Sequence, residues 1–202
     1  MQLPFLHLNL YFNPFGELDC EQRKQLAVVN LSEYKQSLYN KGLAIQFYAD
    51  HGRGKTTHLL ALHNIYPDAE YIKLYAGDKP EIFLRDILFI DSIENLSKRK
   101  RTDLYRNTAS IAFTSHTDLS PEIRQAGYQL INIKISVADN MTLKYIFNRR
   151  IEYARRTDHS IPVVGMPLIY NLRQRYGDNV RAMEAHLYEI FQNLKGISNV
   201  KM

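Results

Sequence analysis

A glycine-containing loop between an apolar run and an amphipathic stretch constrains this chain more than any other feature. Residues 43–61 read LAIQFYADHGRGKTTHLLA, where the apolar run 43–48 is typical of a strand and a helix is expected from Lys55. Glycines 52 and 54 let the backbone turn so that several N–H groups point at one anion. The helix N-terminus and the lysine add positive charge. The stretch therefore predicts a loop that binds nucleotide phosphates.

The loop matches the phosphate-loop pattern G-x-x-x-x-G-K-[ST] at all but one of its defined positions. Gly54, Lys55 and Thr56 are in place, whereas Ala49 stands at the first glycine position. A surface turn with a stray lysine is the alternative, but it does not explain two glycines and paired threonines at these spacings. The predicted nucleotide contacts are Ala49, Asp50, His51, Gly52, Arg53, Gly54, Lys55, Thr56 and Thr57.

Length and composition favour one α/β core with a small appended subdomain. The chain has 202 residues, of which 45% are hydrophobic and 23% charged, as in ordinary globular proteins. Its single cysteine, Cys20, excludes an internal disulfide and favours a reducing cytoplasm. The apolar N-terminus lacks the features of a signal peptide, and no run reaches the ~18 apolar residues of a membrane span. The net charge of +5 permits a polyanionic partner without requiring one.

Three segments are expected. Residues 1–42 form an aromatic arm followed by a helix, 43–138 form the nucleotide-binding domain, and 139–202 form a helical lid. Asp19 and Gln22 predict a capping box at the start of the first helix, which should run to about residue 40 with a break near residue 30.

The middle segment is expected to contain a five-stranded parallel sheet with flanking helices. The run DILFID has four consecutive apolar residues, which is typical of a strand buried on both faces of a parallel sheet. The predicted strands are 43–48, 71–75, 86–91, 110–115 and 128–136, with helices at 55–65, 94–107 and 121–125.

Polar residues end two of these strands, at the edge where open α/β sheets bind ligands. Asp91 ends one strand, and an acid there would hold Mg²⁺ through its water shell together with a hydroxyl of the phosphate loop. The alternative is a turn acid that caps the next helix. Thr114 and Ser115 end another strand, where they either reach the γ-phosphate or its attacking water, or simply terminate the strand.

The last segment predicts three amphipathic helices, at 140–156, at 165–176 and from Asp178 onward. Asp178 would cap the third helix. Arg181 then points about 160° away from Met183 on the apolar stripe. Arg181 therefore faces either solvent or a ligand.

Four pieces of the chain resemble motifs of the AAA+ class of P-loop ATPases. ADHGRGKTT resembles Walker A, DILFID Walker B, AFTSH the end of the sensor-1 strand, and YGDNVRAMEAHL the sensor-2 helix. The last is similar to clamp-loader ATPases and to bacterial replication initiators. The aromatic N-P-F arm resembles ATPases of transposition systems. The likeness covers about residues 11–195, in a minimal form of the class.

The resemblance implies ATP and Mg²⁺ as ligands. Lys55, Gly52 and Gly54 would cradle the phosphates, while Thr56 and Asp91 would hold the metal. Ser115 (or Thr114) would be the sensor-1 group and Arg181 the sensor-2 arginine. Arg124 lies where the class often places an arginine finger for a neighbouring subunit, although a plain surface arginine is the alternative. A homo-oligomer or a protein partner is implied.

One departure from the class concerns turnover. Ser92 follows Asp91, where the class usually has an acid that activates water, and Glu94 would point elsewhere in a helix beginning at Ser92. Loss of a positioned base costs typically ~10²–10⁴-fold in rate. A slow or partner-stimulated ATPase is therefore expected.

Three functions remain open from the sequence. An ATP-dependent assembly switch is favoured, with DNA as a candidate partner; the basic run 98–101 permits DNA contact, although a charge run on a helix is more often a solvated face. A nucleoside-monophosphate-type kinase would use Arg149, Arg150, Arg155 and Arg156 as lid arginines. A non-hydrolysing nucleotide-dependent scaffold is favoured by Ser92. A GTPase is disfavoured because no N-K-x-D motif occurs.

Overall fold

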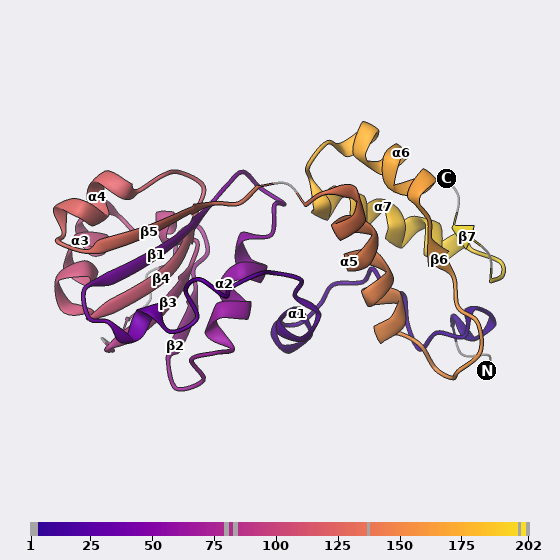
Figure 1. The fold of residues 1–202 in the computed structure, drawn as a ribbon, viewed down its shortest axis with the longest axis horizontal. Coiled ribbons are helices and arrows are strands. Elements are labelled where there is room, and N and C mark those ends of the chain that lie inside the picture. The colour runs from indigo at the N-terminus through magenta and orange to yellow at the C-terminus, as the bar shows by residue number, and fades with distance from the viewer. Residues whose placement is uncertain (1–3, 79–80, 83–84, 137, 198, 201–202) are drawn as a thin grey trace. The chain divides into compact units, whose positions relative to one another are not determined.

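The computed structural model of this protein describes residues 4–78, 81–82, 85–136, 138–197 and 199–200. The chain forms two compact units (Figure 1). One is Val29–Ser136, and the other joins Met1–Val28 with Val137–Met202. The N-terminal arm thus groups with the C-terminal helices. The three predicted segments, as separate domains, stay a prediction.

The unit Val29–Ser136 is built on a five-stranded parallel sheet, which confirms the predicted fold class. The strand order is β2-β3-β4-β1-β5. Tyr48 at the end of β1 pairs with Ser115 of β4 and Lys134 of β5, so the carboxyl ends of these strands lie side by side. The strands are β1 (Leu43–Tyr48), β2 (Glu70–Lys73), β3 (Ile87–Asp91), β4 (Ser110–Ser115) and β5 (Gln129–Lys134).

Helices cover both faces of this sheet, α2 on one face and α3 with α4 on the other (Figure 1). Leu59 and Leu62 of α2 pack on apolar side chains of β1, β3 and β4, whereas Leu104 and Ile123 pack on the opposite side chains of β3 and β4. Each buried side chain of this size contributes about 1.5–3 kcal/mol. The helical elements are η2 (Ser37–Tyr39), α2 (Lys55–His63), η3 (Ile93–Asn95), α3 (Lys98–Asn107) and α4 (Ser120–Gln125).

The second unit contains the three predicted C-terminal helices. A short parallel pair, β6 with β7, was not predicted, because two-residue strands leave no periodic pattern. Within the described residues, no helix combines the length and apolarity that crossing a membrane requires. The elements are η1 (Leu6–Leu8), α1 (Cys20–Leu26), α5 (Asn140–Tyr153), β6 (Val163–Val164), α6 (Met166–Tyr176), α7 (Val180–Asn193) and β7 (Asn199–Val200).

The N-terminal arm is part of the core of this second unit. Leu8 and Leu10 are fully buried in the cluster formed by α5, α6 and α7. The Phe15 ring packs edge-on against Phe147 and Phe191, with centroid distances of 5.9 and 5.1 Å. The sequence predicts the arm but not its burial, because the partners lie more than a hundred residues away.

A buried arginine on α5 fixes the turn of this arm. Arg150 is 5% exposed and donates hydrogen bonds to the backbone carbonyls of Pro14 (2.8 Å) and Gly16 (2.6 Å). It also forms a 2.6 Å ion pair with Glu184 of α7 and lies over the Phe15 ring. One guanidinium therefore connects the arm, α5 and α7.

Two predicted helix boundaries are wrong. The capping box of Asp19 and Gln22 is present, but α1 ends at Leu26 instead of continuing to about residue 40. The side chain of Asn30 accepts a hydrogen bond from the Ser32 backbone, a local turn that competes with helix. Further along, Asn179 caps α7 by accepting from the Ala182 N–H.

Asp178, the predicted cap of α7, pairs with Arg173 at 2.7 Å instead. Because α7 starts at Val180, Arg181 is its second residue and not its third. The side chain of Arg181 is exposed.

Candidate phosphate-binding site

The loop between β1 and α2 has the backbone that phosphate binding requires. Gly52 and Gly54 have φ angles of 75° and 86°, which side-chain-bearing residues rarely adopt. Gly54 is the N-cap of α2 and offers no side chain to the helix, so the first-turn N–H groups can point at an anion. Among the described residues, only Phe5, Asn9 and Ser92 combine a side chain with positive φ. Ala49 therefore needs no glycine conformation, which explains how alanine replaces the first glycine.

Lys55 lies inside the curve of this loop. Its side-chain nitrogen donates to the backbone carbonyls of Ala49 (2.7 Å) and Asp50 (2.8 Å), and the residue is only 8% exposed. The loop thus holds a full positive charge beside its own N–H groups. This is the charge arrangement expected of a site for a polyphosphate.

The carboxylate of Asp91 meets the hydroxyl of Thr56 across the sheet edge. Thr56 Oγ1 lies 3.1 and 3.0 Å from the two carboxylate oxygens. Asp91 also accepts from Thr114 Oγ1 at 2.6 Å and from the Tyr71 hydroxyl at 3.2 Å, and it is 1% exposed. Three hydroxyls from α2, β4 and β2 therefore orient one buried carboxylate.

This donor set fits Mg²⁺. Magnesium keeps several waters and is usually held by one or two protein oxygens together with substrate phosphates. Within the described ranges, no three His, Cys, Asp or Glu side chains gather as a metal-binding group. Thr56 and Asp91 would hold the ion, which supplies charge neutralisation at the phosphates. Their assignment as ligands stays a prediction.

The two hydroxyls at the end of β4 have different partners. Thr114 contacts Asp91, as described above. Ser115 is fully buried, donates to the Thr117 carbonyl and accepts from Gln46 Nε2 at 2.8 Å. The Ser115 hydroxyl proton is thereby used within the fold. Its sensor-1 role stays a prediction.

His116, the next residue, was not among the predicted site residues. Its Nδ1 lies 3.2 Å from Lys55 Nζ, and its ring contacts that of His51 with a centroid distance of 3.7 Å and an interplanar angle of 39°. Burial, reinforced by the nearby charge of Lys55, lowers the pKa of His116 below the ordinary value. The available signal was its position immediately after a strand that ends at the ligand edge.

Glu94 also lies in this cluster, against expectation. Its Oε1 is 3.3 Å from His116 Nε2. The reason is local: Ser92 adopts a left-handed conformation (φ 66°, ψ 53°), and the chain continues as the 3₁₀ helix η3 and not as an α-helix. Burial raises the pKa of the Glu94 carboxyl above its ordinary value, although the Lys55 charge partly opposes the shift.

A hollow of about 240 Å³ lies beside the loop. Whole ligand pockets typically measure about 300–1,000 Å³, so this hollow is smaller than a typical complete pocket. Asp118 on its wall accepts from the Ser120 hydroxyl, and this hydrogen bond is the main cause of its lowered pKa. The lining residues carry charges of both signs and are Tyr48, Ala49, Asp50, Arg53, His116, Asp118, Lys134 and Ile135.

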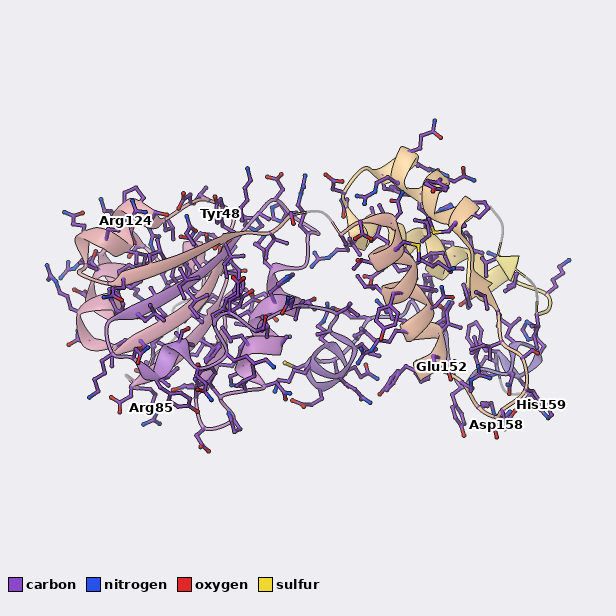
Figure 2. All side chains as sticks on the ribbon, viewed as in Figure 1. Tyr48, Arg85, Arg124, Glu152, Asp158 and His159 are labelled. Atoms are coloured by element: carbon purple, nitrogen blue, oxygen red, sulfur yellow. The ribbon has the colours of Figure 1, made fainter. Side chains whose placement is uncertain are left out.

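The two arginines expected to act from outside this cluster lie on different units. Arg124 projects from α4 and is exposed (Figure 2). Arg181 belongs to the helical unit, on the first turn of α7. Their roles as arginine finger and sensor-2 arginine stay predictions.

Among the comparisons with known proteins, solved structures share the architecture of this chain. No family model matches the chain, and no curated protein matches its sequence. Solved structures do match: domain III of the Thermotoga maritima replication initiation protein DnaA has 16% identity and a TM-score of 0.56. That alignment covers 83% of this chain and 86% of that domain.

Two further structures are similar. The Thermotoga maritima RuvB Holliday junction branch migration motor has 14% identity and a TM-score of 0.55, covering 90% of this chain and 64% of that one. The replication initiator DnaA bound to AMPPCP and single-stranded DNA has 18% identity and a TM-score of 0.51, covering 87% of this chain and 65% of that one. At such identities the likeness establishes the fold. This chain has the fold of the AAA+ P-loop ATPases.

Proposed function

We propose that this protein binds ATP with Mg²⁺ and acts as a slow or partner-stimulated ATPase that switches its assembly with itself or a partner. The observation that carries the proposal is the meeting of the Thr56 hydroxyl and the buried Asp91 carboxylate at 3.0 Å, beside a loop that encloses Lys55. Adenine is preferred because a fold neighbour is bound to AMPPCP. The cytoplasm is the proposed compartment, on the ground of the single cysteine.

Each predicted residue has a role in this proposal. The loop 49–57 and Lys55 would contact the phosphates, and Thr56 with Asp91 would hold Mg²⁺, which would neutralise phosphate charge. Ser115 or Thr114 responds to the γ-phosphate. Arg181 would contact the same phosphate from the lid, and Arg124 would act on a neighbouring subunit.

The test is ATP binding by isothermal titration calorimetry with wild type and Lys55→Ala, in the presence of Mg²⁺. We expect wild type to bind and Lys55→Ala to bind at least about tenfold more weakly, because a charge-assisted contact contributes about 1.5–3 kcal/mol. Lys41→Ala, an exposed lysine outside the loop, is the matched control. Equal affinity for wild type and Lys55→Ala would overturn the site.

The assembly switch is tested separately. Size-exclusion chromatography with light scattering should give a larger particle with ATP and Mg²⁺ than without. Arg124→Ala should reduce ATP turnover in the assembled state and leave nucleotide affinity unchanged. An ATP-bound protein whose mass never changes, alone or with candidate partners, would remove the switch from the proposal.

DNA is proposed as a candidate partner because the neighbour named above also binds single-stranded DNA. Lys98, Arg99 and Lys100 are exposed on α3, whereas Arg101 is held by Glu122 in a two-point ion pair at 2.7 and 2.8 Å. A gel shift at ~50 mM salt, with and without ATP, tests this contact. Absence of binding under both conditions would exclude DNA.

The kinase alternative loses its main support in the helical unit. Arg149 donates to the Gln25 carbonyl at 2.6 Å, and Arg150 is buried against the arm. Arg155 forms a 2.6 Å ion pair with Glu152. Figure 2 shows Glu152 near the end of α5. Arginines used in this way within one unit are poor candidates for phosphate capture. Phosphoryl transfer to nucleoside monophosphates would nevertheless be measured, and robust turnover would reverse this preference.

The scaffold alternative rests on Ser92. The rate of phosphate release distinguishes a scaffold from an ATPase. If wild type and Lys55→Ala release phosphate at the same background rate while wild type binds ATP, the protein is a nucleotide-dependent scaffold. Phosphate release that depends on Lys55 supports the ATPase.

A further inference from the structure

The residue after Asp91 is a serine, so the usual position for a water-activating acid has no carboxylate. A general base for ATP hydrolysis needs a carboxylate near the γ-phosphate, held in a fixed orientation, with one oxygen available to a water molecule. Three observations identify such a group elsewhere in the same cluster.

The first observation is the place of Glu94. Its carboxylate is 3.3 Å from His116 Nε2, and His116 Nδ1 is 3.2 Å from Lys55 Nζ. Lys55 belongs to the phosphate loop, so only the His116 side chain separates Glu94 from the lysine of the predicted phosphate site. The Glu94 side chain is 23% exposed and therefore largely withdrawn from bulk water.

The second observation is the tautomer of His116. An ammonium group only donates hydrogen bonds, so the contact with Lys55 makes Nδ1 the acceptor. The ring proton then resides on Nε2, on the side that faces Glu94 Oε1. The ring also contacts His51 at a centroid distance of 3.7 Å. His116 Nε2 thus lies 3.3 Å from one oxygen of Glu94, a separation that a small reorientation turns into a hydrogen bond.

The third observation is the other carboxylate oxygen. Glu94 Oε2 is buried and makes no hydrogen bond of ordinary geometry among the described residues, although the backbone N–H groups of Glu94 and His116 lie close enough to the carboxylate to lower its pKa. A buried unpaired acceptor costs about 1–3 kcal/mol, so its retention in a fold requires a reason. A water molecule placed for reaction would satisfy this oxygen.

The backbone explains how a residue three positions after Asp91 reaches the site. The Ser92 N–H donates to Thr114 Oγ1 at 2.7 Å, and the same Thr114 hydroxyl donates to Asp91. This pair of hydrogen bonds fixes the left-handed turn at Ser92, a conformation that costs roughly 1–3 kcal/mol in a non-glycine residue. The turn and η3 then direct Glu94 toward His116.

We propose that Glu94 is the general base for ATP hydrolysis and that His116 is the residue that positions it, an inference that rests on the proposed ATPase function. The oxygen of water attacks the γ-phosphorus and forms the new O–P bond, while its proton passes to Glu94 Oε2. The bond from the γ-phosphorus to the bridging oxygen breaks, and ADP leaves with the electron pair. Glu94 then returns the proton to solvent.

The first experiment is a single-turnover assay with the full chain in excess over [γ-³²P]ATP and Mg²⁺. Glu94→Gln keeps the size of the side chain and removes the base. We expect its rate to fall by about 10²–10⁴-fold, with ATP affinity within about threefold of wild type. Glu33→Gln, the same change at an exposed position of the same unit, is the control and should leave both quantities unchanged.

The second experiment separates positioning from simple structural support. His116→Ala should lower the rate by a much larger factor than it weakens ATP binding, since the ring also lines the hollow beside the loop and contacts Lys55. His116→Gln, whose amide N–H can replace the Nε2 donor, should restore part of the rate. Glu94→Gln combined with His116→Ala should be no slower than Glu94→Gln alone, because His116 acts through Glu94.

The outcomes distinguish this inference from the proposed function. A Glu94→Gln rate equal to that of a wild type that hydrolyses ATP overturns the base assignment and leaves the proposed ATPase standing. Wild type that binds ATP without measurable turnover overturns both the base assignment and the proposed ATPase. Additive losses in the double variant overturn the positioning role of His116. Failure of wild type to bind ATP at all overturns the proposed function itself.

Discussion

Among the residues that the structure describes, each unit buries one basic side chain, and the partners of these two cations differ in kind. Arg150 in the helical unit is 5% exposed and connects the arm, α5 and α7 through two backbone carbonyls and the Glu184 carboxylate. Lys55 in the sheet unit is 8% exposed and lies in a loop whose backbone N–H groups are available to an anion.

The difference teaches that burial of a charge does not by itself identify a functional site. The contacts of Arg150 join segments distant in the sequence, which is what a structural cation does. Those of Lys55 include the loop's own carbonyls and His116, close to Asp91 and Glu94. Convergence of several polar side chains at one sheet edge distinguishes the second case.

Arg150→Ala should have the largest effect on stability. We expect a loss of about 3 kcal/mol in the free energy of unfolding, because removal of the guanidinium leaves the Glu184 carboxylate and two backbone carbonyls without their donor. Urea unfolding followed by circular dichroism measures it. Arg149→Ala, which removes one exposed contact to Gln25, should cost less than about 1 kcal/mol. If Arg150→Ala lowers the free energy of unfolding no more than Arg149→Ala does, the structural role of Arg150 is contradicted.

Lys55→Ala should behave in the opposite way. Its unfolding free energy should fall by less than that of Arg150→Ala, while the thermal stabilisation that added ATP gives wild type should be much smaller in the variant. Differential scanning fluorimetry with and without Mg²⁺-ATP compares the two quantities in one experiment. A destabilisation as large as that of Arg150→Ala would make Lys55 a structural cation and break the contrast between the units.

Asp91→Asn should remove the advantage that Mg²⁺ gives to nucleotide binding. Wild type should bind ATP more tightly with Mg²⁺ than with EDTA, and Asp91→Asn should narrow this ratio about tenfold, since an amide no longer carries the charge that holds the ion's shell. Titrations in both buffers measure the ratio. If the ratio of the two affinities is unchanged, Asp91 does not hold the metal and is instead a turn acid that only orders Thr56 and Tyr71.

The smallest expected effect concerns the ion pair between Arg101 and Glu122, whose side chains are both 13% exposed. Hydrogen bonding to Arg101 lowers the pKa of Glu122 below its ordinary value. The folded state therefore binds this proton less readily than the unfolded state, so the pair stabilises the protein above the unfolded pKa and loses its effect as pH falls through the folded pKa.

Glu122→Gln should accordingly cost about 1 kcal/mol at pH 7. The difference from wild type should shrink below about pH 4, the ordinary range of a glutamate pKa. Urea unfolding of both proteins from pH 3 to pH 7 tests the sign. A difference that grows on acidification would show that the pair does not lower the pKa of Glu122.

The sheet unit was predicted well because its signals are local. Apolar runs marked the strands, and the glycines with Lys55 marked the loop; β1, β3 and β4 lie close to the expected positions. Asp91 and Thr56 could be paired in advance because the carboxyl ends of parallel strands meet at one edge. None of these steps needed a distant contact.

The missed residues depended on geometry that residue types do not specify. Glu94 reaches His116 only because Ser92 has positive φ, and a serine gives no sign of that conformation. In the helical unit, the burial of Leu8 and the anchoring role of Arg150 follow from partners far along the chain. Periodicity predicts which face of a helix is apolar but not which segment covers it.

The route of the chain through the two units has a consequence for biosynthesis. The sheet unit, Val29–Ser136, is inserted in sequence between the arm and α5, and the hydrogen bond from Arg150 to Pro14 joins residues 136 positions apart. On the ribosome, the sheet unit can fold while the arm still lacks its partners. Contacts of such high sequence separation form late and slowly. The Phe15 ring therefore lacks its partner Phe191 until α7 has been synthesised, so the core of the helical unit is completed only near the end of translation.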